Sequence, residues 1–260
     1  MNFDEAQVIA TLAQIFGSHH SGVLIGIGDD AAVVTTSPQS VITTDSAVEG
    51  THFNTEWSGA FDIGRKITAA NLADIYAMGA TPQYLVVAVT LTGSESMEWI
   101  SDLAHGIQHE ARSCGAAVVG GDLTQGVIKV ISITAVGSVE KITTRGGGAP
   151  GDLIYISSLP GWSAAGLSVI NKDGADDLEA YAIEQFCAPS VDYSAAVAMA
   201  SAGASAMCDV SDGLIIQAAQ MAEASGASFN FNKDLFTADP EFFALSELAE
   251  KCGIDVWQWI

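Results

Sequence analysis

Residues 62–91 read DIGRKITAANLADIYAMGATPQYLVVAVTL, and this stretch predicts the fold class. Its first part, residues 62–78, predicts a helix that Gly79 and then Pro82 bring to an end. Its second part, residues 84–91, is rich in β-branched side chains and predicts a buried strand. A helix followed at once by a buried strand indicates a domain in which helices cover a sheet.

The elements expected on either side extend this pattern. Residues 4–16 predict a helix, because their apolar positions recur at helical spacing. Further β-like runs and one more helix then give the order strand-strand-strand-helix-strand-helix-strand-strand, which indicates an α/β fold of the α+β kind rather than strict alternation. These further elements are expected at residues 23–27, 31–35, 41–44, 95–114 (the helix), 117–119 and 127–136.

The segment TTRGGGAPG at residues 143–151 is the clearest break in the chain. Clustered glycine and proline punctuate structure, so we expect a domain boundary there. The expected domains are residues 1–145 and residues 146–260, the second an α/β domain. Strand candidates in this second, helix-rich domain lie at residues 153–157, 206–210 and 228–231.

Charge and composition exclude several classes of protein. The chain of 260 residues has 31 acidic and 9 basic side chains, for a net charge of −22, so we expect no nucleic-acid partner and no docking on an anionic membrane. Hydrophobic residues make up 49% of the chain, which is typical of a folded globular protein. The apolar run at residues 84–91 is too short to span a bilayer, and the amino terminus lacks a basic targeting signal. We therefore expect a soluble, cytoplasmic protein whose four cysteines, with no CxxC pair, stay reduced.

The sequence does not support three common kinds of binding motif. The glycines of GIGDDA at residues 26–31 fit a loose dinucleotide pattern, but a β-like run follows where a helix would have to receive the phosphates. No lysine is followed by Ser or Thr in a phosphate-binding loop. His105 and His109 have the spacing of a metal pair, but a surface or packing role is expected because no third ligand can be assigned.

Aspartates beside Gly, Thr or Ser recur at what we expect to be the ends of β-like runs. One such aspartate is typical of a turn or a helix cap, but five separate segments in a chain of low charge density are not. Mg²⁺ prefers carboxylate oxygens and bridges them to substrate phosphates, so the pattern favours a metal–nucleotide site. The aspartates are Asp29, Asp30, Asp45, Asp74, Asp122, Asp209 and Asp212.

At these residues the sequence resembles the thiamine-monophosphate kinase family, within the aminoimidazole-ribonucleotide-synthetase-like superfamily. The motifs together are specific in their order and spacing, whereas each alone is weak. They are GIGDDAAV (26–33), TTDSAVEGTHF (43–53), KITAANLADIYAMGATP (66–82), GGDLT (120–124), TRGGGAPGD (144–152) and DVSDGL (209–214).

The resemblance implies roles for individual residues. It implies that His52 contacts the thiamine phosphate substrate and that no residue acts covalently. Arg145 also suits phosphate contact on its own chemistry, as a lone guanidinium in a glycine-rich loop. The implied ligands of several Mg²⁺ ions are Asp30, Thr43, Thr44, Asp45, Asp74, Asp122, Asp209 and Asp212. The implied ATP contacts are Gly121, Asp122, Arg145 and Ser211.

The resemblance further implies ATP-dependent phosphorylation of thiamine monophosphate by direct transfer. It also implies that residues 1–145 bind ATP and Mg²⁺ and dimerise, so that two mixed sheets form a barrel. Leu123 and Gln217 depart from the family pattern, and family members continue past residue 260, so we expect an incomplete carboxy-terminal domain. A sister ATP-using enzyme of the superfamily, or a non-catalytic Mg-ATP-binding remnant, are the alternatives. An amino-terminal cysteine would favour selenophosphate synthesis, but the first cysteine is Cys114.

Overall fold

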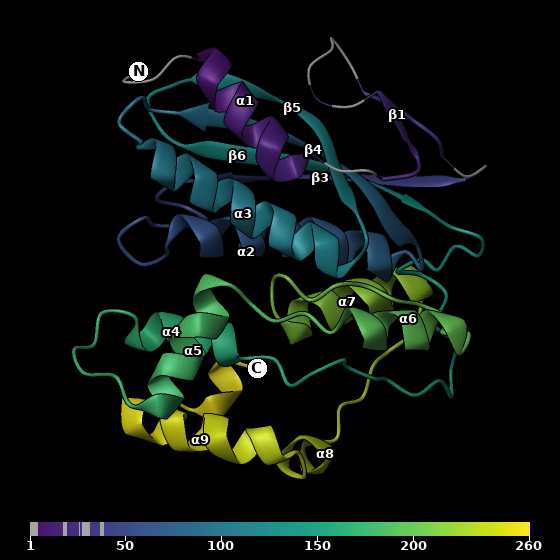
Figure 1. Ribbon diagram of the computed structural model, residues 1–260. Coiled ribbons are helices and arrows are strands. Elements are labelled where there is room, and N and C mark those ends of the chain that lie inside the picture. Colours follow the sequence, from purple (N-terminus) through teal and green to yellow (C-terminus); the bar gives the residue numbers. More distant parts are fainter. Residues whose placement is uncertain (1–4, 18–19, 26, 28–31, 37–38) are drawn as a thin grey trace. The chain divides into compact units, whose positions relative to one another are not determined.

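The helix and the strand predicted at residues 62–91 are both present (Figure 1). The strand is an inner strand of a mixed four-stranded sheet, and the helix is one of those that cover the sheet. The computed structural model describes residues 5–17, 20–25, 27, 32–36 and 39–260. The chain divides into two units, residues 1–142 and 143–260.

The sheet of the first unit has the strand order β3-β6-β4-β5. Strand β6 pairs antiparallel with both β3 and β4, while β4 and β5 run parallel. The long connection that a parallel pair requires is supplied by helix α3. The strands span Ser40–Val48 (β3), Thr81–Leu91 (β4), Ala117–Gln125 (β5) and Val130–Ser138 (β6).

Helices cover one face of this sheet (Figure 1). They are α1 (Glu5–Phe16), α2 (Ala60–Ala77) and α3 (Met97–Ser113), close to the predicted helices. The backbones of α2 and α3 approach so closely that a Cβ on Gly106 would lie 2.0 Å from the carbonyl oxygen of Phe61, and one on Gly64 would lie 2.3 Å from that of Leu103. Glycine at both positions therefore permits the contact between the two helices.

Val23 and Val34 pack against Tyr84 and Val136 at one end of the opposite face, and beyond them side chains of this face are exposed among the described residues. Ile42 is 67% exposed there, and Val86 is also exposed. Cross-strand hydroxyl pairs line the same face: Thr134 Oγ1 donates to Thr44 Oγ1 at 3.1 Å, and Ser46 and Ser132 bond at 2.6 Å. The sheet thus has one apolar face under helices and one open face of small, polar and β-branched side chains.

A second, two-stranded sheet pairs β1 (Val23–Ile25) with β2 (Val33–Val34). These strands lie within the predicted runs at residues 23–27 and 31–35. Most of the GIGDDA motif, residues 26 and 28–31, lies outside the described residues.

The second unit consists of helices and loops among its described residues. The predicted strands at residues 153–157, 206–210 and 228–231 are wrong, because none of them has a neighbouring strand to receive its backbone hydrogen bonds. Leu153, for example, is 76% exposed. The helices are α4 (Trp162–Val169), α5 (Asp177–Cys187), α6 (Tyr193–Ser201), α7 (Leu214–Ser225), α8 (Lys233–Thr237), α9 (Pro240–Cys252) and the short 3-10 helix η1 (Val256–Gln258).

Helices α4, α5 and α9 and the residues after α9 pack around a core of their own. Trp162, Leu245, Leu248 and Trp259 are buried in it. None of the helices among the described residues of the whole chain is long and apolar enough to cross a membrane.

Candidate functional site

Two of the predicted metal ligands meet where β3 lies against α2. Thr43 and Asp45 alternate with exposed residues, so both lie on the helix-covered side of β3. Thr43 Oγ1 donates to Asp74 Oδ2 of α2 at 2.6 Å. The backbone N–H of Asp45 donates to Asn71 Oδ1 at 3.2 Å, and the buried Asn71 amide is held in turn by Ile67 O at 3.0 Å. Strand β3 is therefore fixed to the helix one turn before Asp74.

The donor chemistry of this cluster suits Mg²⁺. Thr43, Asp45 and Asp74 supply only hard oxygen atoms, and Mg²⁺ uses one or two protein carboxylates while keeping waters and substrate phosphates as further ligands. Within the described part of the chain, no group of three or more His, Cys, Asp or Glu side chains could hold a metal ion. Asp30, the further predicted ligand, lies outside the described residues, as does Asp29.

Thr44 lies on the other face of the same strand. Its Oγ1 donates to Ile133 O at 3.1 Å and accepts from Thr134 Oγ1. Successive side chains of a strand point to opposite faces, so consecutive residues cannot all aim their side chains at one ion. The structure joins Thr43 and Asp74, but it does not join the Thr44 hydroxyl to them.

Gly121 and Asp122 lie on β5, at the edge of the sheet opposite to β3. Three strand spacings separate these edges, which is roughly 14 Å. Asp122 is exposed and is paired in register with Ala88, on the open face. A Cβ at position 121 would lie 1.9 Å from Val87 O, so glycine is required there. Within one chain, Asp122 is therefore not close to Thr43, Asp45 and Asp74.

The imidazole of His52 follows the end of β3 on an exposed turn. The ring Nδ1 accepts the backbone N–H of Val48 at 3.1 Å, and the backbone N–H of His52 donates to Val48 O at 2.9 Å. A ring whose Nδ1 accepts must carry its proton on Nε2 when it is neutral. Nε2–H is then the group available to donate to a phosphate oxygen.

Arg145 and Asp209 come together in the second unit. Arg145 Nη2 lies 3.8 Å from Asp209 Oδ1, and Nη1 donates to Gln220 Oε1 of α7 at 2.6 Å. The arginine side chain remains 45% exposed. Its guanidinium is thus oriented by two partners and still accessible to a phosphate group. No sequence motif points to Gln220, which lies 75 residues from Arg145.

Ser211 and Asp212 are exposed in the loop before α7. Gln217 Nε2 donates to Ser211 Oγ at 3.2 Å, while the buried Gln217 Oε1 has no partner among the described residues. Because Ser211 Oγ accepts from Gln217, its own O–H is oriented to donate elsewhere. In the sequence, Gln217 is only a departure from the family pattern, whereas in the structure it contacts Ser211, a predicted ATP ligand.

Known proteins resemble the chain in sequence. Residues 28–139 match the family described as AIR synthase related protein, N-terminal domain. A thiamine-monophosphate kinase of Corynebacterium glutamicum is 36% identical over 266 residues, which cover 98% of this chain and 77% of that protein.

Solved structures resemble it as well. Thiamine-monophosphate kinase from Stenotrophomonas maltophilia superposes with a TM-score of 0.72 at 31% identity, over 85% of this chain and 71% of that one. A structure described as AaThiL complexed with AMPPCP and TMP has a TM-score of 0.75 at 24% identity, over 98% of this chain and 80% of that one. At that identity the second structure supports the fold.

Proposed function

The chain belongs to the thiamine-monophosphate kinase family, and we propose that it transfers the γ-phosphoryl group of ATP to thiamine monophosphate by Mg²⁺-assisted in-line displacement. Identity of 36% over nearly the whole chain carries the assignment of the activity. The pairing of Thr43 with Asp74 beside Asp45 supports the proposed role of the metal.

No side chain has to form a covalent bond in this reaction. The phosphate of the acceptor is already a nucleophile, so the protein contributes by positioning both substrates and by neutralising charge. When bound, Mg²⁺ supplies positive charge to the phosphate oxygens. His52 Nε2–H would donate to the acceptor phosphate, and Arg145 would hold the nucleotide phosphates, each oriented as described above.

The full set of proposed ligands follows the family motifs. Asp45, Asp74 and Thr43 form its best-supported part, because they lie together on β3 and α2. Ser211 would donate to the nucleotide, with Gln217 orienting its hydroxyl. The remaining metal ligands proposed are Asp30, Thr44, Asp122, Asp209 and Asp212, and Gly121 with Asp122 completes the ATP contacts.

We also propose that the protein is a homodimer in which the open face of the sheet is covered by a second copy. The exposure of Ile42 and Val86 on that face supports this assembly, since apolar side chains gain free energy when they leave water. We propose the cytoplasm as the compartment, because the four cysteines include no CxxC pair and are expected to stay reduced.

ADP release tests the proposed reaction. We expect ADP release with thiamine monophosphate and Mg²⁺, and none above background with thiamine, which lacks the acceptor phosphate. Removal of Mg²⁺ by EDTA should stop turnover, and added Mg²⁺ should restore it. ATP hydrolysis that does not depend on thiamine monophosphate, or equal rates with and without Mg²⁺, would overturn the proposal.

Replacement of Arg145 tests the proposed nucleotide contact. Arg145→Met removes the guanidinium and keeps much of the apolar stem, so the KM for ATP should rise about tenfold, the effect of losing one charge-assisted bond. The KM for thiamine monophosphate should stay within about twofold of the wild-type value. Lys141→Met is the matched control, because Lys141 is exposed and lies four residues away. Equal effects of the two substitutions on the KM for ATP would contradict a specific role for Arg145.

A further inference from the structure

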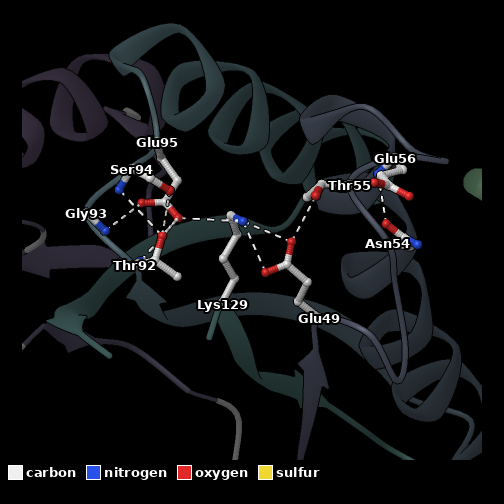
Figure 2. Close-up of polar contacts among 9 residues, drawn as sticks. All are labelled: Glu49, Asn54, Thr55, Glu56, Thr92, Gly93, Ser94, Glu95 and Lys129. Atoms are coloured by element: carbon white, nitrogen blue, oxygen red, sulfur yellow. Dashed lines mark hydrogen bonds and ion pairs between the residues drawn. The ribbon is translucent and has the colours of Figure 1, made fainter. Parts of the chain in front are cut away.

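One cation, Lys129, lies between two carboxylates that are distant in sequence (Figure 2). Its Nζ donates to Glu49 Oε1 at 2.9 Å and to Oε2 at 3.1 Å, and it lies 3.7 Å from Glu95 Oε1. The lysine side chain is only 14% exposed, and that of Glu95 only 1%. Partial burial reduces the screening of such charges by solvent, so this contact differs from an ordinary surface ion pair.

Of the two carboxylates that contact Lys129, that of Glu95 is held in place by its own turn. It accepts hydrogen bonds from Thr92 N at 3.1 Å, Thr92 Oγ1 at 2.7 Å and Gly93 N at 2.9 Å (Figure 2). Burial raises the pKa of the Glu95 carboxyl, but these donors outweigh it and the pKa is lowered. A charged Glu95, held by the turn between β4 and α3, therefore gives Lys129 a rigid partner.

Glu49, the second carboxylate that contacts Lys129, belongs to the segment that contains His52. Thr55 Oγ1 donates to Glu49 Oε1 at 2.9 Å, and Glu49 N donates to Lys129 O at 3.0 Å. Burial raises the pKa of the Glu49 carboxyl, but Lys129 and Thr55 lower it by more, so the group is ionised. His52 lies between Glu49 and Thr55 in the sequence, and the hydrogen bond between these two side chains closes the segment around it.

We propose that Lys129 is a positioning residue for the acceptor site. Its ammonium holds Glu49, and through Glu49 the segment 49–55, so that His52 keeps its Nδ1 on the Val48 N–H and presents Nε2–H to the phosphate of the acceptor. The inference rests on the proposed function and adds a residue to its acceptor site.

The effect of removing the cation should be local. Without Lys129, the Glu49 and Glu95 carboxylates lose the charge that lies between them, and like charges at short range repel. Glu95 is held by three donors of its own turn, whereas Glu49 lies on the segment after β3. Glu49 should therefore move, and His52 with it.

The test compares Lys129→Met with Lys129→Arg. Misplacement of a contacting group by about 1 Å is costly, so Lys129→Met should raise the KM for thiamine monophosphate roughly ten- to hundredfold. The KM for ATP should change less than about twofold, and Lys129→Arg should recover most of the loss. Thr55→Val removes one hydrogen bond from the ionised Glu49 carboxylate, which keeps Lys129 as its partner, and should raise the same KM roughly two- to fivefold.

Arg65→Met is the matched control, because Arg65 forms a partly buried ion pair with Glu110 elsewhere in the same unit. It should leave the KM for thiamine monophosphate unchanged, which separates positioning from a general loss of stability. A parallel rise in the KM for ATP in the Lys129 and Thr55 variants, or equal effects in Arg65→Met, would overturn the proposal.

A second readout does not depend on turnover. NMR chemical shifts of the His52 ring nitrogens, followed over a series of pH values, should show the Nε2–H tautomer of the neutral ring in the wild type and in Lys129→Arg, and a mixture of tautomers in Lys129→Met. The signals are assigned by their loss in His52→Gln. An unchanged Nε2–H tautomer in Lys129→Met would refute the positioning role. Lack of turnover in the wild type, with the expected tautomer shift in Lys129→Met, would instead refute the proposed function alone.

Discussion

Asp74→Ala should lower kcat at least about a thousandfold, because a metal ligand contributes several kcal/mol of charge stabilisation and each 1.4 kcal/mol is tenfold in rate. Asp45→Ala should have an effect of the same order. Both residues lie at the junction of β3 and α2, and both are only partly buried, so the fold should largely survive. The measurement is ADP release with thiamine monophosphate over a range of Mg²⁺ concentrations.

Asp74→Asn makes this test sharper. The amide oxygen can still accept the hydroxyl of Thr43, so the contact between β3 and α2 is kept while the charge is lost. Asp102→Asn, an exposed site on α3, is the matched control and should retain activity. Wild-type turnover of Asp74→Asn and Asp45→Ala at limiting Mg²⁺ would contradict the metal site.

Gly106→Ala should lower the free energy of unfolding by about 2–3 kcal/mol, the usual cost of forcing an extra carbon into a packed core. Its Cβ would lie 2.0 Å from Phe61 O, so α2 and α3 would have to separate. Helix propensity alone predicts the opposite sign, since Ala is favoured over Gly by about 1 kcal/mol in a helix. Urea unfolding followed by circular dichroism measures the difference.

Gly120→Ala is the control for that experiment. Position 120 lies in β5, and a Cβ there would meet nothing within 4 Å. We expect a change within about 0.5 kcal/mol, as for substitutions that touch no packed feature. Equal stability of the wild type and Gly106→Ala would show that the contact between α2 and α3 is less tight than the structure has it.

The helices of the first unit could be predicted because each has a local signal. Residues 62–78 have a clear end at Gly79, and the observed helix is Ala60–Ala77. In the second unit the prediction of strands failed. A run such as residues 153–157 has the composition of a strand, but a strand exists only when a neighbour accepts its backbone hydrogen bonds, and that neighbour is not specified locally.

The amino-acid sequence alone identifies the family, through motifs whose order and spacing are specific, and from them it predicts the residues that carry the chemistry. Which of these residues lie together depends on the tertiary fold. Strand alternation separates Thr43 from its neighbour Thr44, and strand order puts Asp122 on the edge opposite to Asp45. Packing also joins Glu49, Glu95 and Lys129, which no motif connects. The reason is physical: a motif records which atoms are present, whereas the pairing of strands and the packing of helices set the distances between them.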